Sequence, residues 1–140
     1  MYRSISHQAD IAVEIEADSL EELFRDSLSA LIELLTGDES EGARHGDELQ
    51  PFVIEAEGFD SEELLVGLLG ELLFAAQTRQ WGPREVVSVE LIPASRVTAT
   101  INGIPNGGGE KLRREIKAAT YHNLKISFQD KWRVRIVFDV

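Results

Sequence analysis

Two aspartates near opposite ends of the sequence could take part in one chemical site. Asp10 ends the motif HQAD at residues 7–10, and Asp139 is the centre of FDV at residues 138–140. Carboxylate oxygens favour calcium, magnesium or manganese over zinc. If the first and last strands are antiparallel neighbours, the start of one lies beside the end of the other. The two aspartates would then meet, and their like charges would repel unless a cation lay between them.

Ordinary surface ion pairs are the alternative for both aspartates. Asp10 could pair with His7 or with a lysine. Asp139 could pair with Arg133 or Arg135. Exposed pairs of this kind contribute at most about 1 kcal/mol to stability. The residues alone leave the metal site and the ion pairs both open.

A second group of polar side chains lies in the C-terminal third of the chain. Lys117, Tyr121 and His122 offer a cation, a phenol and an imidazole that could contact a nucleotide or a protein partner. His7 and Glu71 are further candidates for such a contact. They could equally be ordinary residues of a strand surface. Glu71 lies among leucines of an apolar helix, where it could be partly buried and paired with Lys117 or open to water at the helix edge.

The sequence carries none of the common enzyme signatures. It has no cysteine, so thiolate zinc sites and cysteine nucleophiles are excluded. The histidines at positions 7, 45 and 122 lack metal-ligand spacing, and no phosphate-binding glycine loop, zinc helix or nucleophile elbow occurs. We therefore expect a protein that is not itself an enzyme.

Strands at both ends of the chain would position the two aspartates. Ile11, Val13, Ile15 and Ala17 alternate with more polar residues, which is typical of a strand with one buried face. The same alternation at 132–138 predicts that Asp139 lies on the non-core face of the last strand, as Asp10 does on the first.

The remaining pattern predicts two helices and further strands. One helix begins after Ser19 and ends near Gly37, and another begins at Asp60-Ser61. Polar or glycine-rich loops are expected at 37–50 and 102–109, and strands at 52–57, 86–92, 97–101, 114–119 and 124–128. We expect an α+β fold, a single two-layer domain over residues 1–140, with two main helices packed on a largely antiparallel sheet.

Charge and hydropathy limit the partners. The chain has 14 Lys and Arg against 25 Asp and Glu, a formal net charge of −11. Such a protein should repel a phosphate backbone, so tight direct binding of nucleic acid is not expected. The charge would favour docking on a basic surface, or it could serve solubility alone. No signal peptide or membrane-spanning segment is expected, which predicts a cytoplasmic protein with no membrane partner.

Five motifs in order resemble those of the archease family. HQAD is similar to the family's His-Thr-Ala-Asp, and EIKAATYHNL at 115–124 is similar to Val-Lys-Ala-Val-Thr-Tyr-His-Gly-Leu. The others are DSLEELF at 18–24, EELLVGLLGELLF at 62–74 and the terminal FDV. The matches are collinear and span nearly the whole chain. Gln8, Gly67 and Gly70 depart from the family pattern.

The resemblance implies a function and a site. It implies a non-catalytic cofactor that promotes guanylylation and repeated turnover of an RtcB-type RNA ligase in tRNA splicing or RNA repair. GTP would be used by the ligase rather than bound by this chain alone. A divalent-metal site, with calcium favoured and magnesium or manganese as alternatives, would use Asp10, Asp139 and a main-chain or terminal oxygen of Val140.

Two other functions stay open at the level of sequence. One is a general protein-binding or chaperone-like module that uses its apolar helices and long loops. The other is a metal-dependent hydrolase built from Asp10, Asp139 and His122, although no nucleophile motif accompanies them.

Overall fold

The computed structural model describes residues 10–37, 49–78, 81–93, 95–105 and 115–140. In these segments the elements follow the order β2 (Ile11–Ala17), α1 (Leu20–Thr36), β3 (Gln50–Glu57), α2 (Ser61–Thr78), β4 (Gly82–Ile92), β5 (Arg96–Ile104), β6 (Ala118–Thr120), β7 (Ser127–Gln129) and β8 (Lys131–Asp139). Every strand pairing among them is antiparallel. The predicted α+β class is confirmed.

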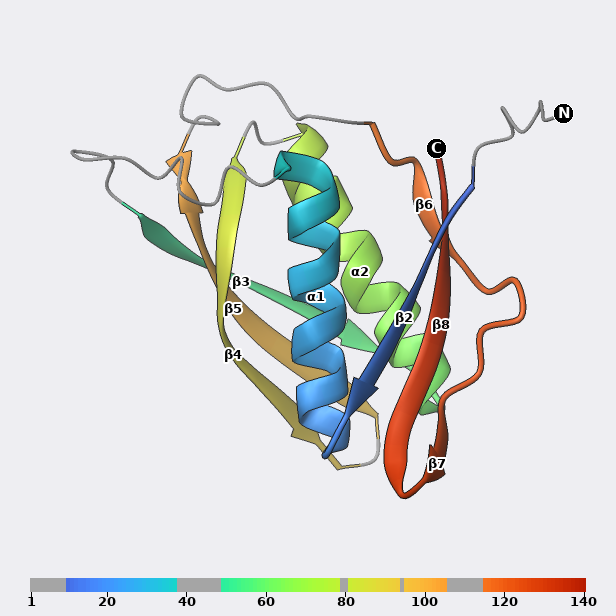
Figure 1. Cartoon of the computed structure of the whole chain (residues 1–140). Helices are drawn as coiled ribbons and strands as arrows, with labels where there is room; N and C mark the ends of the chain where they lie inside the picture. The colour runs from blue at the N-terminus through green and yellow to red at the C-terminus, as the bar shows by residue number, and fades with distance from the viewer. Residues whose placement is uncertain (1–9, 38–48, 79–80, 94, 106–114) are drawn as a thin grey trace, which may run out of the picture.

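The strands divide between two sheets rather than forming one. The first sheet has the order β2-β8-β6, with β7 pairing with the other end of β8, and the second has the order β3-β5-β4. Both helices lie between the sheets in Figure 1. Helix α1 packs on β4 and β2, whereas α2 packs on β3 and β6. The helices therefore bury apolar side chains against both sheets, which a single sheet would not allow.

Both helices begin with the same local hydrogen bonds. Ser19 Oγ accepts from the Glu22 N–H at 3.1 Å, and Glu22 Oε1 accepts from the Asp18 N–H at 3.0 Å. At α2, Asp60 Oδ1 accepts from the N–H of Glu63 at 2.8 Å, in the same geometry. These side chains satisfy N–H groups that have no partner within the helix. The predicted starts of both helices are confirmed, with Asp60 rather than Ser61 as the cap of α2.

The end of α1 and the buried faces of both helices follow the sequence pattern. Gly37, with φ of 76°, ends α1 as predicted, and its N–H donates to the Glu33 carbonyl at 2.7 Å. The buried face of α1 is a stripe at helical spacing: Leu23, Phe24, Ser27, Leu28, Leu31, Ile32 and Leu35. The buried positions of α2 form a broader apolar surface, with pairs of adjacent leucines and alanines: Leu64, Leu65, Leu68, Leu69, Leu72, Leu73, Ala75 and Ala76.

Strand β5 continues into a segment predicted to be a loop. Asn102, Gly103 and Ile104 pair with β3 and β4, so the predicted loop at 102–109 is wrong for these three residues. A Cβ on Gly103 would lie 2.5 Å from the ring of Trp81, and only a glycine fits under this indole. The glycine that suggested flexibility is there because two elements approach closely.

Two other strands are shorter than the pattern suggested. Strand β6 covers 118–120, whereas a strand was predicted over 114–119, and β7 covers 127–129, whereas 124–128 was predicted. Asn123 and Asp130 both have positive φ, of 54° and 72°, and mark turns on either side of β7. Residue 114, His7 and most of the predicted loop at 37–50 lie outside the described residues.

Candidate functional site

The end of the first sheet brings Asp10 and Asp139 to adjacent positions. Ile11 is the Cα partner of Phe138 in the antiparallel pairing of β2 with β8. Asp10 immediately precedes this pair and Asp139 immediately follows it, so the two residues share one end of the ladder. Both are exposed, and neither forms an ion pair with another described residue. Figure 1 shows the start of β2 beside the C-terminus.

The alternation of the two strands sets this orientation. Val134, Ile136 and Phe138 are buried, whereas Arg133, Arg135 and Asp139 are exposed. On β2, Ile11, Val13 and Ile15 are half-buried and pack against the core, while Ala12, Glu14 and Glu16 are exposed. The predicted faces of both strands are confirmed, except that Val137 on the outer face of β8 is also buried.

Strand β6 adds Lys117 to the same end, which the sequence did not reveal. The Lys117 N–H donates to the main-chain carbonyl of Asp139 at 2.7 Å, next to the pairing of Ala118 with Asp139. Val140 follows directly and is half-buried. The strand order β2-β8-β6 therefore gathers Asp10, Lys117, Asp139 and Val140 around one sheet end. Only the long-range pairing reveals this, because nothing local to Lys117 indicates it.

Other predicted site residues lie elsewhere. Tyr121 and His122 are exposed and come after β6, whose direction leads the chain away from Asp139. The His122 N–H donates to Thr120 Oγ1 at 3.2 Å. Glu71 is exposed on α2 without an ion pair to Lys117, which agrees with the water-exposed alternative. His7 lies outside the described residues.

The chemistry of the sheet end is that of a sparse oxygen site. Within the described segments, no group of three or more His, Cys, Asp or Glu side chains could hold a metal ion. Two aspartates and nearby main-chain oxygens suit a hard cation only if water or a partner completes the shell. The donor set fits calcium, magnesium or manganese in kind, and its small number predicts weak binding by this chain alone.

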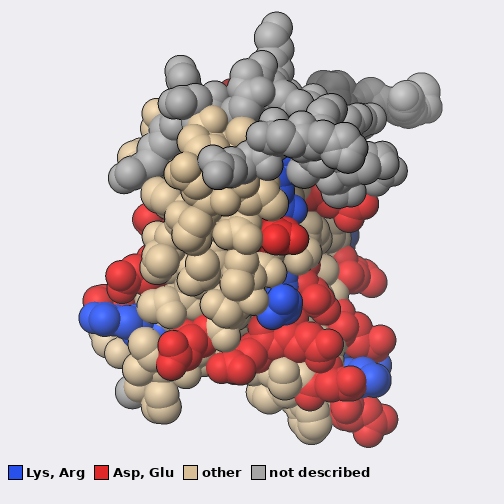
Figure 2. Space-filling model, turned by 90° about the vertical axis from the view of Figure 1, so that its left-hand side faces the viewer, with Lys and Arg blue, Asp and Glu red and all other residues tan. Residues whose placement is uncertain are grey.

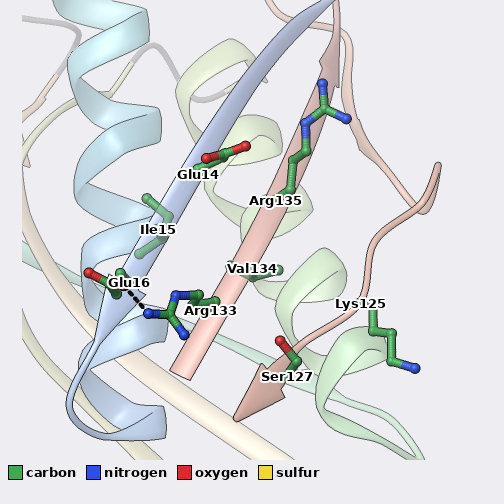
Figure 3. Close-up of a pocket in the computed structure, with 8 residues that line it drawn as sticks. All are labelled: Glu14, Ile15, Glu16, Lys125, Ser127, Arg133, Val134 and Arg135. Atoms are coloured by element: carbon green, nitrogen blue, oxygen red, sulfur yellow. Dashed lines mark ion pairs between the residues drawn. The ribbon is translucent and has the colours of Figure 1, made fainter. Parts of the chain in front are cut away.

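An open groove of about 480 Å³ crosses the outer face of β2 and β8. Figure 3 shows Glu14, Glu16, Arg133 and Arg135 along its floor, with an ion pair of 2.7 Å between Arg133 and Glu16. This pair overturns the alternative in which Arg133 pairs with Asp139. Glu14 stands directly across from Arg135 in the register. The groove carries both signs of charge, and its cross-strand pairs contribute to register and stability.

The far end of β8 has a further charged contact. Lys131 Nζ donates to Asp18 Oδ1 at 2.6 Å, and this hydrogen bond raises the pKa of the lysine. The contact joins the hairpin of β7 and β8 to the start of α1. It lies at the end of the sheet opposite to Asp10 and Asp139.

One known protein family matches almost the whole chain. The model of the Archease protein family matches residues 2–140. The chain belongs to the archease family. It is 30% identical to the archease of Methanopyrus kandleri, covering 99% of each chain, and 32% identical to that of Archaeoglobus fulgidus, covering 97% of this chain and 96% of that one.

Solved archease structures share the fold. A Thermotoga maritima archease, described as a possible chaperone, is 25% identical with a TM-score of 0.67, covering 100% of this chain and 98% of that one. Protein 1598 of Methanobacterium thermoautotrophicum is 26% identical with a TM-score of 0.67, covering 94% and 93%. No described helix of this archease is long and apolar enough to cross a membrane.

Proposed function

We propose that this archease is a non-catalytic cofactor of an RtcB-type RNA ligase. Its carboxylate end, defined as Asp10, Asp139 and Val140, enters the basic RNA channel of the ligase and promotes guanylylation of the ligase by GTP. The cofactor leaves when RNA returns, so the ligase turns over repeatedly. The nucleotide chemistry belongs to the ligase.

The observation that carries this proposal is the register of β2 and β8. It supports the proposal because Asp10 and Asp139, both exposed, occupy adjacent backbone positions at one sheet end, and neither forms an ion pair with a described residue. Two acidic side chains at one sheet end would be attracted to a basic channel or to a divalent cation. Membership of the archease family and the net charge of −11 support the same assignment.

A divalent cation at the carboxylate end would supply positive charge that phosphate oxygens or ligase carboxylates could share. Asp10 and Asp139 would hold it through carboxylate oxygens and Val140 through a main-chain oxygen. Lys117, whose N–H already holds the Asp139 carbonyl at 2.7 Å, fixes the main chain at this point. This hydrogen bond orders the residue that must present its carboxylate to the partner.

Turnover of the ligase tests the proposal. Product formed per ligase is measured at excess RNA with GTP and manganese, with and without this archease. We expect many turnovers with wild type, about one turnover without it, and about one with Asp139→Asn, which keeps the shape and removes the charge. Glu90→Gln, an exposed carboxylate on β4, is the matched control and should stimulate fully.

Circular dichroism of each variant confirms that it is folded. The functional proposal fails if wild type gives no additional turnover with the ligase of its own host. The site assignment fails if folded Asp139→Asn stimulates as well as wild type.

A chaperone-like role is the second candidate. It is favoured by large apolar side chains that the described surface exposes, among them Phe74 and Phe128 at 55% and 59%, and by the description of the Thermotoga maritima relative as a possible chaperone. Suppression of aggregation of an unrelated client, such as thermally unfolded citrate synthase, at sub-stoichiometric amounts would support this role. A lack of suppression at equimolar amounts would reject it.

A further inference from the structure

Phe59 lies almost entirely in solvent at the start of α2. Its side chain is 97% exposed, more than any other large apolar side chain in the described segments. The order Phe59, Asp60, Leu64 fits a hydrophobic staple, in which the residue before the cap packs on the fourth residue of the helix. In this structure the staple is not formed, because the ring has almost no contact with Leu64. An aromatic side chain is thus free to contact something else.

An apolar cleft of about 240 Å³ lies beside Phe59. It is formed where the turn before α2 meets the β4-β5 hairpin and the start of α1, and the Gly58 N–H joins the first two by donating to the Ser95 carbonyl at 3.1 Å. Its apolar lining consists of Leu20, Phe59, Leu64, Leu91, Ile92 and Pro93. Ile92 and Pro93 are exposed, so the apolar surface continues beyond the cleft.

Carboxylates surround this cleft. Glu63 Oε1 accepts from the Phe59 N–H at 2.7 Å, and Glu21 Oε2 accepts from the Leu91 N–H at 3.3 Å, so both are fixed at the rim. Asp60 also lines the cleft, and none of its described lining residues is basic. The nearby Arg96 is already held by Glu57 at 3.0 Å. Figure 2 shows carboxylates gathered over the lower part of the molecule, where this hairpin lies.

We propose that the cleft binds a segment of a partner protein in which an apolar side chain is flanked by lysine or arginine. The apolar side chain packs against Leu20, Leu64 and the exposed ring of Phe59, and the flanking cations meet the acidic rim. Aromatic residues at a partly enclosed apolar pocket are typical centres of binding energy in protein interfaces. The negative rim selects basic protein partners and repels nucleic acid.

The cleft and the carboxylate end can act independently. Leu20 lies beyond the end of β2, whereas Asp10 precedes its start, and the seven residues of β2 alone span roughly 23 Å at about 3.3 Å each. A partner bound in the cleft would therefore leave Asp10 and Asp139 accessible. The site would let this archease hold a second protein while its other end is engaged.

Peptide titration monitored by amide chemical shifts tests the proposal. The probe is acetyl-Lys-Arg-Leu-Leu-Arg-Lys-amide, added to the isotope-labelled full chain. We expect shifts centred on Phe59, Ser61 and Ile92, and binding that weakens as salt rises. Phe59→Ala should raise Kd about tenfold or more. Val53→Ala, which truncates an exposed apolar side chain on β3, should leave Kd unchanged.

Two altered peptides separate the apolar from the charged contribution. Replacing both leucines by serine, or all basic residues by glutamate, should abolish the shifts at the cleft. The proposal is overturned if the probe causes no shift there at about 1 mM, a concentration that would detect even weak binding. It is also overturned if either altered peptide binds as well as the probe, or if Phe59→Ala binds with unchanged Kd.

Discussion

Exposure and strand register determine which charged groups Asp10 and Asp139 can bind. Arginine is available on the same face of β8, yet Arg133 is held by Glu16 at 2.7 Å. The two aspartates keep their carboxylates free of ion pairs with described residues. A cation that binds to both carboxylates in the folded state alone would stabilise that state.

We predict that calcium, magnesium or manganese raises the melting temperature of this archease. A ligand that binds only the folded state stabilises it by about 1.4 kcal/mol at ten times its Kd, which corresponds to a few degrees for a chain of this size. Asp10→Asn should abolish the increment, and Glu14→Gln, an exposed carboxylate on the same strand, should preserve it. Differential scanning calorimetry with added metal or chelator measures this. An increment that persists in Asp10→Asn would remove Asp10 from the site.

Asp26 on α1 should make stability depend on pH. Partial burial, together with the nearby Glu22, raises the pKa of Asp26 above its ordinary value, against a smaller lowering effect of Arg25. The folded state therefore binds the proton more tightly than the unfolded state, and stability falls as pH rises through the window between the two pKa values.

Asp26→Asn should therefore be slightly more stable than wild type at pH 7, by about 0.5 kcal/mol or less, because the side chain is only half-buried. The difference should shrink as pH is lowered towards the ordinary aspartate pKa of about 3.9. Urea unfolding at pH 7 and pH 4.5 measures it, with Glu33→Gln on the same helix as control. A difference that grows at low pH would contradict the assigned cause.

At the scale of elements, close packing by neighbouring elements explains Gly67 and Gly103 better than flexibility does. Gly67 of α2 faces β3, where an added Cβ would lie 3.1 Å from the Cβ of Ala56. Gly103 of β5 lies under Trp81, whose ring also packs on Phe52 with centroids 4.9 Å apart. Gly70 has open space around it. The three positions should therefore respond differently to an added methyl group.

We predict that Gly103→Ala destabilises the fold by about 2 kcal/mol, because the new Cβ would overlap Trp81 and the Gly82 carbonyl. Gly70→Ala should stabilise it by about 0.5–1 kcal/mol, since alanine loses less backbone entropy in a helix and meets no neighbour here. Chemical denaturation gives both values, and near-ultraviolet circular dichroism reports the packing of Trp81. Equal effects of the two substitutions would contradict this view of the packing.

At the scale of the molecule, acidic residues lie at both ends, so each end could bind a different basic partner. The carboxylate end lies where β2 begins and β8 ends, and the cleft beside Phe59 lies where both helices begin. Basic residues are few, and three of those described, Arg96, Lys131 and Arg133, form ion pairs with carboxylates. The described surface therefore offers no continuous basic footprint for a phosphate backbone.

We predict negligible affinity of this archease for isolated tRNA at about 150 mM salt, because the net charge of −11 gains nothing from counterion release. A filter-binding assay with labelled tRNA measures it, with a basic RNA-binding protein as positive control. Binding at micromolar Kd or tighter would contradict the proposal that this archease acts by docking on a protein.

The sequence by itself determined the local features of this archease. The starts of both helices were predicted from Ser19 and Asp60, because capping depends on residues three or four apart. The exposed positions of Asp10 and Asp139 followed from the alternation of their own strands. These predictions succeeded because a side chain's face is set by the period of the element that carries it.

Tertiary structure alone decided which elements meet. The alternation of apolar residues indicates which face of a strand is buried, but it does not indicate which strand pairs with it. The division into two sheets and the position of Lys117 beside Asp139 could therefore not be derived from the sequence. Gly103 belonged to a predicted loop, whereas in the structure it lies in β5 and packs against Trp81. The cleft beside Phe59 is built from three turns far apart in sequence. Such features depend on long-range packing, for which a single sequence carries no local signal.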